Sequence, residues 1–310
     1  MLVAKASNGR ILSKCKIIVT KNTKEQEQLN KIIENEKKNG RNPIDNDEVV
    51  KLLRKEFSAL SDDAFNEIKK ILHDAEEPFK SLFLHTVLNT NFSIKKDINV
   101  SNYWGKTNTV TMKTSQLTSK IHEKNGILFH EYGHAIDSLC PDKQGYNSVN
   151  NGELKEKIRE DIEDTIRKTI NAIVVKYKYR LSSKNIHNIV SNIMGYSNMP
   201  ELDDKLKYFR DKTVEDINKR LKNGGPPYNA ISDVYGGMTN NVLLGEIGHE
   251  KDYWYDRNGN DFNCQPSELW AEYYSCCIRN SPGKGAIRDY FPKSTKIMDQ
   301  MALDMLAQLG

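Results

Sequence analysis

Two histidines and a glutamate with the spacing of a metal site lie near the middle of the sequence. Residues 127–137 read ILFHEYGHAID and include His130, Glu131 and His134. Side chains four residues apart on a helix lie one above the other on one face, so the two imidazoles can share a metal ion. Glu131, next to the first histidine, can then take a proton from a water on that ion. The pattern predicts a Zn²⁺ site with Glu131 as general base.

The residues around this motif are small or apolar. Tyr132 and Gly133 fill its variable positions, and Ile136 follows the second histidine. A match on a solvent-exposed helix would carry charges there, so the pattern favours a helix buried on most sides. We expect this helix to cover about 123–139 and to end before Pro141, because proline cannot continue it. A buried helix whose two histidines are hydrogen-bonded without a metal is the alternative.

A third ligand is needed, because a catalytic zinc takes three protein ligands and keeps one position for water. The stretch SELWAEYYSCCIRN, 267–280, predicts a helix with Glu268 and Glu272 one turn apart among apolar residues. Buried carboxylates need a partner, and a metal ion is one. We therefore predict Glu268 as the third ligand and Glu272 as a support for a ligating histidine. The reverse assignment stays open, as does a plain helix-dipole role for Glu268.

A zinc hydrolase also needs a donor for the oxyanion of its tetrahedral intermediate. His249, Tyr253 and Tyr255 lie just before the helix of the third ligand. Of these we favour His249 and Tyr253, with a buried aromatic contact as the alternative for each. Asp137 shares the helix face of the two histidines and is predicted to orient an imidazole by a hydrogen bond. A surface aspartate near the helix end is the alternative there.

The elements that must position these residues are mostly helical. The alternating pattern around an Asn-Gly pair predicts a hairpin at 2–7 and 10–19. Alternating β-branched residues predict strands within 98–117, and we expect 109–114 to be an edge strand that a peptide substrate could join. An ordinary hairpin strand is the alternative. Charged, amphipathic helices fill 151–222 and form a layer that covers the core or meets a partner.

Composition sets the broad class of the protein. The 310 residues include 28% charged residues and carry a formal net charge of +4. The sequence has no run of eighteen apolar residues that could span a membrane. The first nineteen residues lack the basic region and the apolar region of a secretory signal. Five cysteines without a C-x-x-C pair argue against a disulfide framework. We expect a cytoplasmic protein with no membrane partner, and nothing in the charge demands nucleic acid.

The combination of HEYGHAID with a later E-x-x-A-E helix resembles the zinc peptidase domain of the anthrax lethal factor type. The resemblance implies that Glu268, which opens the E-x-x-A-E turn, is the third ligand. Segments at 235–241, 248–254 and 290–292 resemble metallopeptidase-like domains of phage and prophage proteins, which often accompany head-morphogenesis proteins. The lethal-factor pattern has a catalytic tyrosine seven residues before the third ligand, where this chain has Asp261. The oxyanion donor must therefore come from elsewhere.

This resemblance spans about 100–310, with the helices of 141–226 unmatched. It implies an α+β, mainly α fold: a zincin-like metallopeptidase core of the gluzincin kind, with a small sheet and helical additions. The expected division is an N-terminal hairpin with helices, 1–95, and a zincin-like domain, 96–310, with a helical insertion at about 145–225. The expected activity is zinc-dependent endopeptidase cleavage of a peptide or protein.

Two alternatives to a working peptidase stay open. One is a phage or prophage structural or interaction protein whose zinc site serves stability, with a phage head or another protein as its partner. It is motivated by the long charged helices of 151–222. The other is a toxin-like effector protease delivered into another cell, motivated by the lethal-factor resemblance. The chain would then be virion-associated or delivered rather than resident in the cytoplasm.

Overall fold

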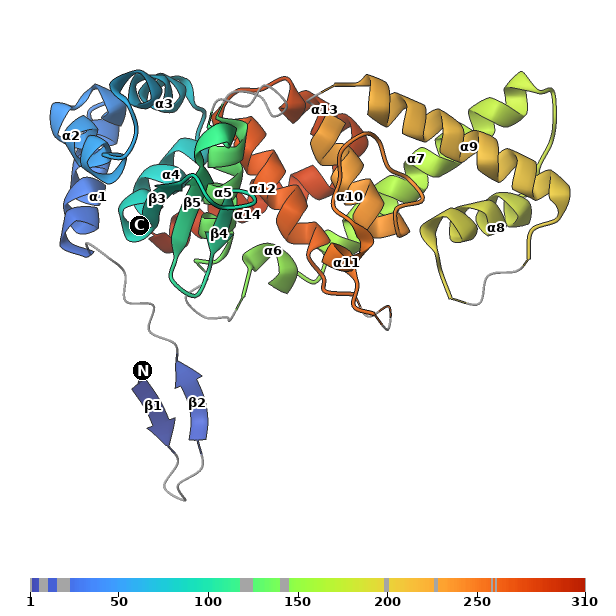
Figure 1. Cartoon of the computed structure of the whole chain (residues 1–310), viewed down its shortest axis with the longest axis horizontal. Coiled ribbons are helices and arrows are strands. Elements are labelled where there is room, and N and C mark those ends of the chain that lie inside the picture. The colour runs from blue at the N-terminus through green and yellow to red at the C-terminus, as the bar shows by residue number, and fades with distance from the viewer. Residues whose placement is uncertain are drawn as a thin grey trace.

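The structure is a computed structural model, and it describes residues 2–5, 11–15, 23–117, 125–139, 145–197, 201–225, 228–257, 259 and 261–309. Helices dominate these ranges and accompany two small sheets, which confirms the expected α+β, mainly α class (Figure 1). Figure 1 shows α1–α4 at one end of the molecule, α7–α9 at the other, and α5 and α12 between them. None of the described helices is long and apolar enough to cross a membrane.

The N-terminal part combines the expected hairpin with a helical cluster. Strands β1 and β2 pair antiparallel, while the rest of the predicted hairpin lies outside the described residues. The helices that follow pack leucine, isoleucine and phenylalanine side chains into one buried core. These elements are β1 (Leu2–Lys5), β2 (Ile11–Cys15), α1 (Thr23–Lys38), η1 (Pro43–Asp45), α2 (Asp47–Glu56), α3 (Asp62–Asp74), α4 (Phe79–Thr86) and η2 (Val87–Asn89).

The second sheet has three strands in the order β3-β5-β4. Strand β3 (Asn91–Lys95) runs parallel to β5 (Thr109–Lys113), and β4 (Asn102–Trp104) pairs antiparallel with the other side of β5. The expectation that 109–114 forms an edge strand is therefore wrong, because both sides of β5 are already paired. Periodicity showed an extended segment but could not show its neighbours, and β3 was not expected at all. The strand at the sheet edge beside helix α5 is β4.

The centre of the fold is a pair of closely packed helices, α5 (Gly126–Asp137) and α12 (Gln265–Ile278). Gly133 permits their contact, since a Cβ built there would lie 2.8 Å from the Cα of Ala271. The indole Nε1 of Trp270 donates to the Gly133 carbonyl at 3.0 Å, and Ser275 Oγ donates to the Gly126 carbonyl at 2.8 Å. These contacts fix the antiparallel register of the two helices.

The remaining helices extend and brace this pair. Helix α7 packs against α8, α9 and α14, so the helical layer inserted after α5 is joined to the C-terminal end of the chain. The last elements of the chain were not assigned from sequence. The helices are α6 (Asn147–Asn150), α7 (Leu154–Lys176), α8 (Ser183–Met194), α9 (Asp204–Asn223), α10 (Asn229–Thr239), α11 (Lys251–Trp254), α13 (Gly283–Tyr290) and α14 (Pro292–Leu309), and η3 is Thr114–Gln116.

A buried carboxylate joins the helical layer to the C-terminal helix. Asp161 on α7 is 1% exposed and accepts hydrogen bonds from the backbone N–H of Lys293 and from both the N–H and the hydroxyl of Ser294, at 2.8–3.2 Å. The carboxylate thereby caps the first turn of α14, where backbone N–H groups have no acceptor within the helix.

We expect Asp161→Ala to lower the free energy of unfolding by about 2 kcal/mol, because buried donors lose their acceptor. Denaturant titration followed by circular dichroism measures this change. Asp164→Asn is the matched control, since its ion pair with Lys293 is half-exposed and should contribute less than about 0.5 kcal/mol. Equal effects of the two substitutions would contradict the cap.

Candidate metal centre

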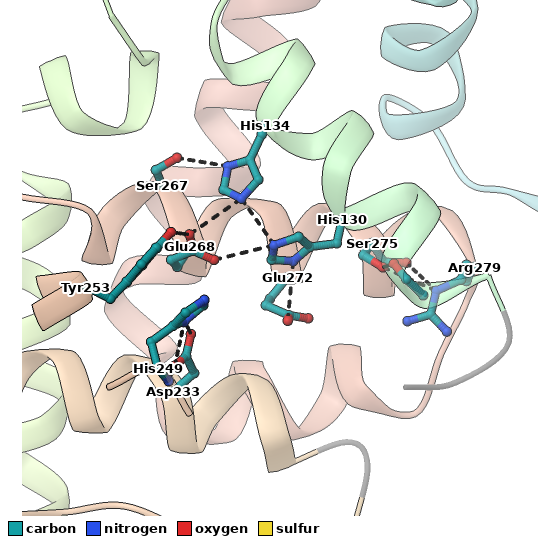
Figure 2. A network of polar contacts seen from close by, with 11 residues as sticks. His130, His134, Asp233, His249, Tyr253, Ser267, Glu268, Glu272, Ser275 and Arg279 are labelled. Atoms are coloured by element: carbon teal, nitrogen blue, oxygen red, sulfur yellow. Dashed lines mark hydrogen bonds and ion pairs between the residues drawn. The ribbon is translucent and has the colours of Figure 1, made fainter. Parts of the chain in front are cut away.

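Three predicted ligand side chains meet between α5 and α12. The Nε2 atoms of His130 and His134 lie 3.1 Å apart. The carboxylate of Glu268 lies 3.4 Å from the first of these nitrogens and 3.6 Å from the second (Figure 2). Ligand atoms around a tetrahedral zinc with bonds of 2.0–2.1 Å are about 3.3 Å apart. The spacings between the ligand groups are close to this value, with Oε2 of Glu268 facing His130 and Oε1 facing His134.

The helix pair explains why these atoms converge. His130 and His134 stand one turn apart on α5, on the side that faces the first turn of α12. Antiparallel packing brings Glu268, in that first turn, opposite the C-terminal half of α5. Glu268 is 3% exposed, and its Oε2 has no hydrogen-bond partner among the described residues. A buried carboxylate oxygen without a hydrogen-bond donor suits a cation, so the residues present fit a zinc ion.

The other glutamate of the E-x-x-A-E turn has a different place. Glu272 Oε1 lies 3.3 Å from Nδ1 of His130, on the side of the ring that faces away from His134. Glu268, and not Glu272, therefore faces both Nε2 atoms. Glu272 can orient the imidazole and increase its basicity, which is the supporting role that the sequence analysis gave it.

His134 is oriented through a serine. Its Nδ1 lies 3.1 Å from the hydroxyl of Ser267, and Ser267 in turn hydrogen-bonds the carboxylate of Asp137. Asp137 is fully buried and also accepts from the backbone N–H of Ser148 at 2.8 Å. Asp137 therefore reaches the imidazole through Ser267 and not by the direct hydrogen bond that the sequence predicted. Because Asp137 is buried, the alternative of a surface aspartate is wrong. Ser267 was missed because it stands 133 residues after His134 in the chain.

The charges around the cluster favour a cation. Burial would lower the pKa of His130, but the carboxylates of Glu272 and Glu268 outweigh burial and raise it well above its ordinary value. Burial would raise the pKa of Glu268, but His134 and His130 hold it well below its ordinary value. A buried site that stabilises positive charge on its imidazoles also stabilises a metal ion.

Glu131 lies between the metal ligands and strand β4. Its carboxylate is buried and accepts a hydrogen bond from the backbone N–H of Tyr103. Burial raises the pKa of Glu131, which makes the ionised carboxylate a stronger base. Together with His130, it lines a cavity of about 270 Å³ beside the cluster.

His249 reaches the same cavity from the opposite side. Asp233 on α10 accepts from the backbone N–H of His249 at 2.6 Å and from its Nδ1 at 2.8 Å. Burial would lower the pKa of His249, but Asp233 raises it, so the imidazolium form is favoured. In Figure 2 the ring edge opposite Asp233 points toward Glu268 and His130. No sequence motif marked Asp233, which lies 16 residues before its partner.

The tyrosines predicted as donors separate in the structure. Tyr253 stacks on His249 with ring centroids 3.8 Å apart, and its hydroxyl donates to Oε1 of Glu268. Burial and the nearby Glu268 raise the pKa of Tyr253, so its phenol stays protonated. Tyr255 instead donates to the carbonyl of Gly237 at 2.6 Å and is not part of the cluster.

Asp261, at the position where the lethal-factor pattern has a catalytic tyrosine, is held by other groups. Its carboxylate binds Lys155 of α7 at 2.6 Å and the backbone N–H of Asn263 at 2.7 Å. These contacts anchor the loop before α12 to the helical layer. The donor that the lethal-factor pattern places here is absent from this position, and His249 and Tyr253 lie closer to the ligands.

Comparison with known proteins adds no assignment to this geometry. No protein-family model, curated protein or solved structure matches the chain. The lethal-factor resemblance therefore stays a prediction that depends on HEYGHAID and the E-x-x-A-E helix.

We expect Gly133→Ala to reduce zinc affinity and thermal stability together. The added methyl would lie 2.8 Å from Cα and 3.2 Å from the carbonyl oxygen of Ala271, so α12 must move away and take Glu268 with it. Isothermal titration with zinc and a thermal melt measure the two effects. Gly285→Ala on α13 is the control, because a methyl there meets nothing within 4 Å. Unchanged zinc affinity in Gly133→Ala would contradict the dependence of the cluster on this helix contact.

Proposed function

We propose that this protein is a zinc-dependent peptidase in which His130, His134 and Glu268 hold the metal. The observation that carries the proposal is the convergence of three kinds of group on one cavity: a ligand triad, a buried general base and an oriented imidazolium. A site that only binds metal for stability needs neither the base nor the imidazolium, and structural zinc sites usually have four protein ligands.

The division of roles follows from the chemistry of each group. A zinc ion held here would polarise the scissile carbonyl and acidify a water. Glu131 accepts the proton of the attacking water and later delivers it to the leaving amine. The His249 imidazolium, oriented by Asp233, donates to the oxygen on which negative charge develops. Tyr253 donates its one hydroxyl proton to Glu268 and so holds this ligand in place.

The substrate class follows from the sheet edge beside Glu131. Strand β4 pairs with β5 on one side, and the N–H of Tyr103 on its other side already reaches Glu131. Val100 and Ser101, just before β4, line the cavity. An extended peptide that lies across the cavity mouth beside β4 would bring a carbonyl near the triad. A peptide or protein substrate is therefore part of the proposal, held by the cavity and not by strand pairing, because the N–H groups of Ser101 and Tyr103 already bond Gln116 and Glu131.

The two alternative functions predict a different behaviour of the metal site. A phage structural protein with a zinc site for stability would bind metal without hydrolysing peptides. A delivered effector would use the same chemistry on a host protein. The Glu131 carboxylate favours catalysis over a stability role, because a buried base beside the ligands costs folding free energy and serves no metal contact.

We expect Glu131→Gln to keep one zinc per chain and to lower kcat on a cleaved peptide by about 10²–10⁴-fold, because only the general base is removed. Zinc is measured by inductively coupled plasma mass spectrometry and hydrolysis by mass spectrometry of a peptide library. Glu246→Gln is the control, since this glutamate is outside the residues that line the cavity. Full hydrolysis by Glu131→Gln would exclude the assigned role.

We expect His249→Gln to lower kcat by about 10²–10³-fold with a smaller change in KM, since the donor acts mainly on the charge of the transition state. Asp233→Asn should show a weaker loss of the same kind, because the imidazole remains but its orientation and charge are less favoured. Steady-state kinetics separates kcat from KM. A loss confined to KM would show that His249 only binds the ground state.

A further inference from the structure

The basic residues of the chain concentrate in one part of the helical layer. Residues 176–223, from the last residue of α7 to the last residue of α9, hold eleven lysines and arginines against six aspartates and glutamates. The whole chain has 46 against 42, so the rest of the chain has a slight acidic excess. The small net charge of the whole chain therefore hides a basic region.

The most basic stretch follows α7 directly. It reads KYKYRLSSK, 176–184, and contains four cations, two tyrosines and no acidic residue. All four cations are exposed, and none has an ion pair with another of the described residues. The acidic residues of α9 are instead compensated within that helix, through the pairs Lys207–Asp204, Arg210–Asp211, Lys212–Glu215 and Arg220–Asp216. The cations of 176–184 are therefore available to an external anion.

Helix α7 ends in a tight turn at Lys178. The backbone N–H groups of Lys178 and Tyr179 donate back to the carbonyls of Val175 and Val174, at 3.0 and 2.9 Å. Lys178 takes the left-handed conformation, with φ of +52°. Glycine is the usual residue at such a helix end, because a side chain there costs folding free energy. The lysine at this position adds an exposed cation to the turn.

Two exposed tyrosines lie among these cations. Tyr177 is 47% exposed, and Tyr208 on α9 is 44% exposed. Their ring centroids lie 5.9 Å apart, and the ring planes differ by 78°. Tyr179 and Phe209, close to them in the chain, pack against each other and against the core instead. The contact between Tyr177 and Tyr208 thus leaves nearly half of each side chain open to solvent.

Lysines lie beside these aromatic rings. The Nζ of Lys176 is 5.9 Å from the centroid of the Tyr177 ring, and the Nζ of Lys205 is 3.9 Å from that of Tyr179. We call the following residues the basic tip: Lys176, Tyr177, Lys178, Arg180, Lys205 and Tyr208. The basic tip lies at the end of the molecule opposite α1–α3 and away from α5 and α12 (Figure 1). A ligand bound there would leave the candidate metal centre open.

We propose that the basic tip binds single-stranded nucleic acid, with bases stacked on Tyr177 and Tyr208 and phosphates paired with the cations around them. Bases stack on exposed aromatic rings, and cations beside the rings neutralise the phosphate backbone. The steep angle between the two rings favours a single strand, whose successive bases can tilt apart, over a duplex, whose bases stay parallel.

Two other anionic partners fit the basic tip less well. A membrane surface takes up several apolar side chains, but Val175 is the one exposed large aliphatic residue in the described part of α7–α9. An acidic protein segment would pair with the cations without a need for two exposed rings. The exposed tyrosine pair is therefore the observation that favours nucleic acid.

The test is the fluorescence anisotropy of a short labelled oligothymidylate with the full-length protein, repeated over a range of salt concentrations. Neither a peptide nor a metal ion is needed, so the result is independent of the proposed peptidase function. We expect the affinity to fall with salt with a slope of log affinity against log salt of about −2 to −3, since three or four cations contact phosphates.

Substitutions separate the phosphate contacts from base stacking. Lys178→Gln and Arg180→Gln should each reduce the magnitude of the salt slope by about 0.7, whereas Lys31→Gln, an exposed lysine on α1, should leave it unchanged. Tyr177→Leu and Tyr208→Leu should each weaken binding by about 10-fold without a change in slope. Tyr177→Phe and Tyr208→Phe are the matched controls and should retain binding, because stacking needs only the ring.

Competition with other anions completes the test. Duplex DNA, polyglutamate and vesicles of phosphatidylserine with phosphatidylcholine should each displace the labelled strand less well than unlabelled oligothymidylate does. Equal displacement by any of them, or binding that Tyr177→Leu and Tyr208→Leu leave unchanged, would show a general surface for polyanions and overturn the proposal. A lack of binding at low salt would overturn it as well.

Discussion

The site depends on the close antiparallel contact of α5 and α12. The contact requires glycine at 133, because any larger residue meets the backbone of Ala271 at 2.8 Å. The same approach places two imidazoles of one helix opposite a carboxylate of the other at 3.4–3.6 Å. The packing of the two helices and the spacing of the metal ligands therefore depend on one interhelical distance. Buried hydrogen bonds from Trp270 and Ser275 to α5 carbonyls hold that distance.

Polar groups outside the triad connect it to distant parts of the chain. His134 reaches Asp137 through Ser267, and Asp137 is held by the first turn of α6, so one ligand is tied to the start of the helical layer. Asp161 ties that layer to α14. Buried hydrogen bonds thus connect the inserted helices to the helix pair and to α14. A hydrogen-bonded outer layer of this kind is what keeps ligand imidazoles in one tautomer and orientation.

Local patterns predicted the parts of the site that one segment encodes. The spacing of His130, Glu131 and His134 is a property of one helix, and the apolar surroundings of Glu268 mark a buried carboxylate, so both could be predicted from the sequence. The Asp233–His249 pair and the role of Ser267 depend on contacts between separate elements, which periodicity does not contain. The prediction of an edge strand was wrong for the same reason. Alternating β-branched residues identified β5, but its two neighbours place it in the centre of the sheet. Helical content was predictable before the last two helices, α13 and α14, because amphipathic spacing is local.

The most direct test of the zinc assignment is the metal content of two matched variants. Native mass spectrometry at a buffered free-zinc concentration reports the number of ions per folded chain. We expect one zinc in wild type and in Glu272→Gln, whose side chain faces the outer nitrogen of His130, and none in Glu268→Gln, whose side chain faces both inner nitrogens. A wild-type chain without zinc, or a Glu268→Gln chain that retains it while Glu272→Gln loses it, would contradict the assignment.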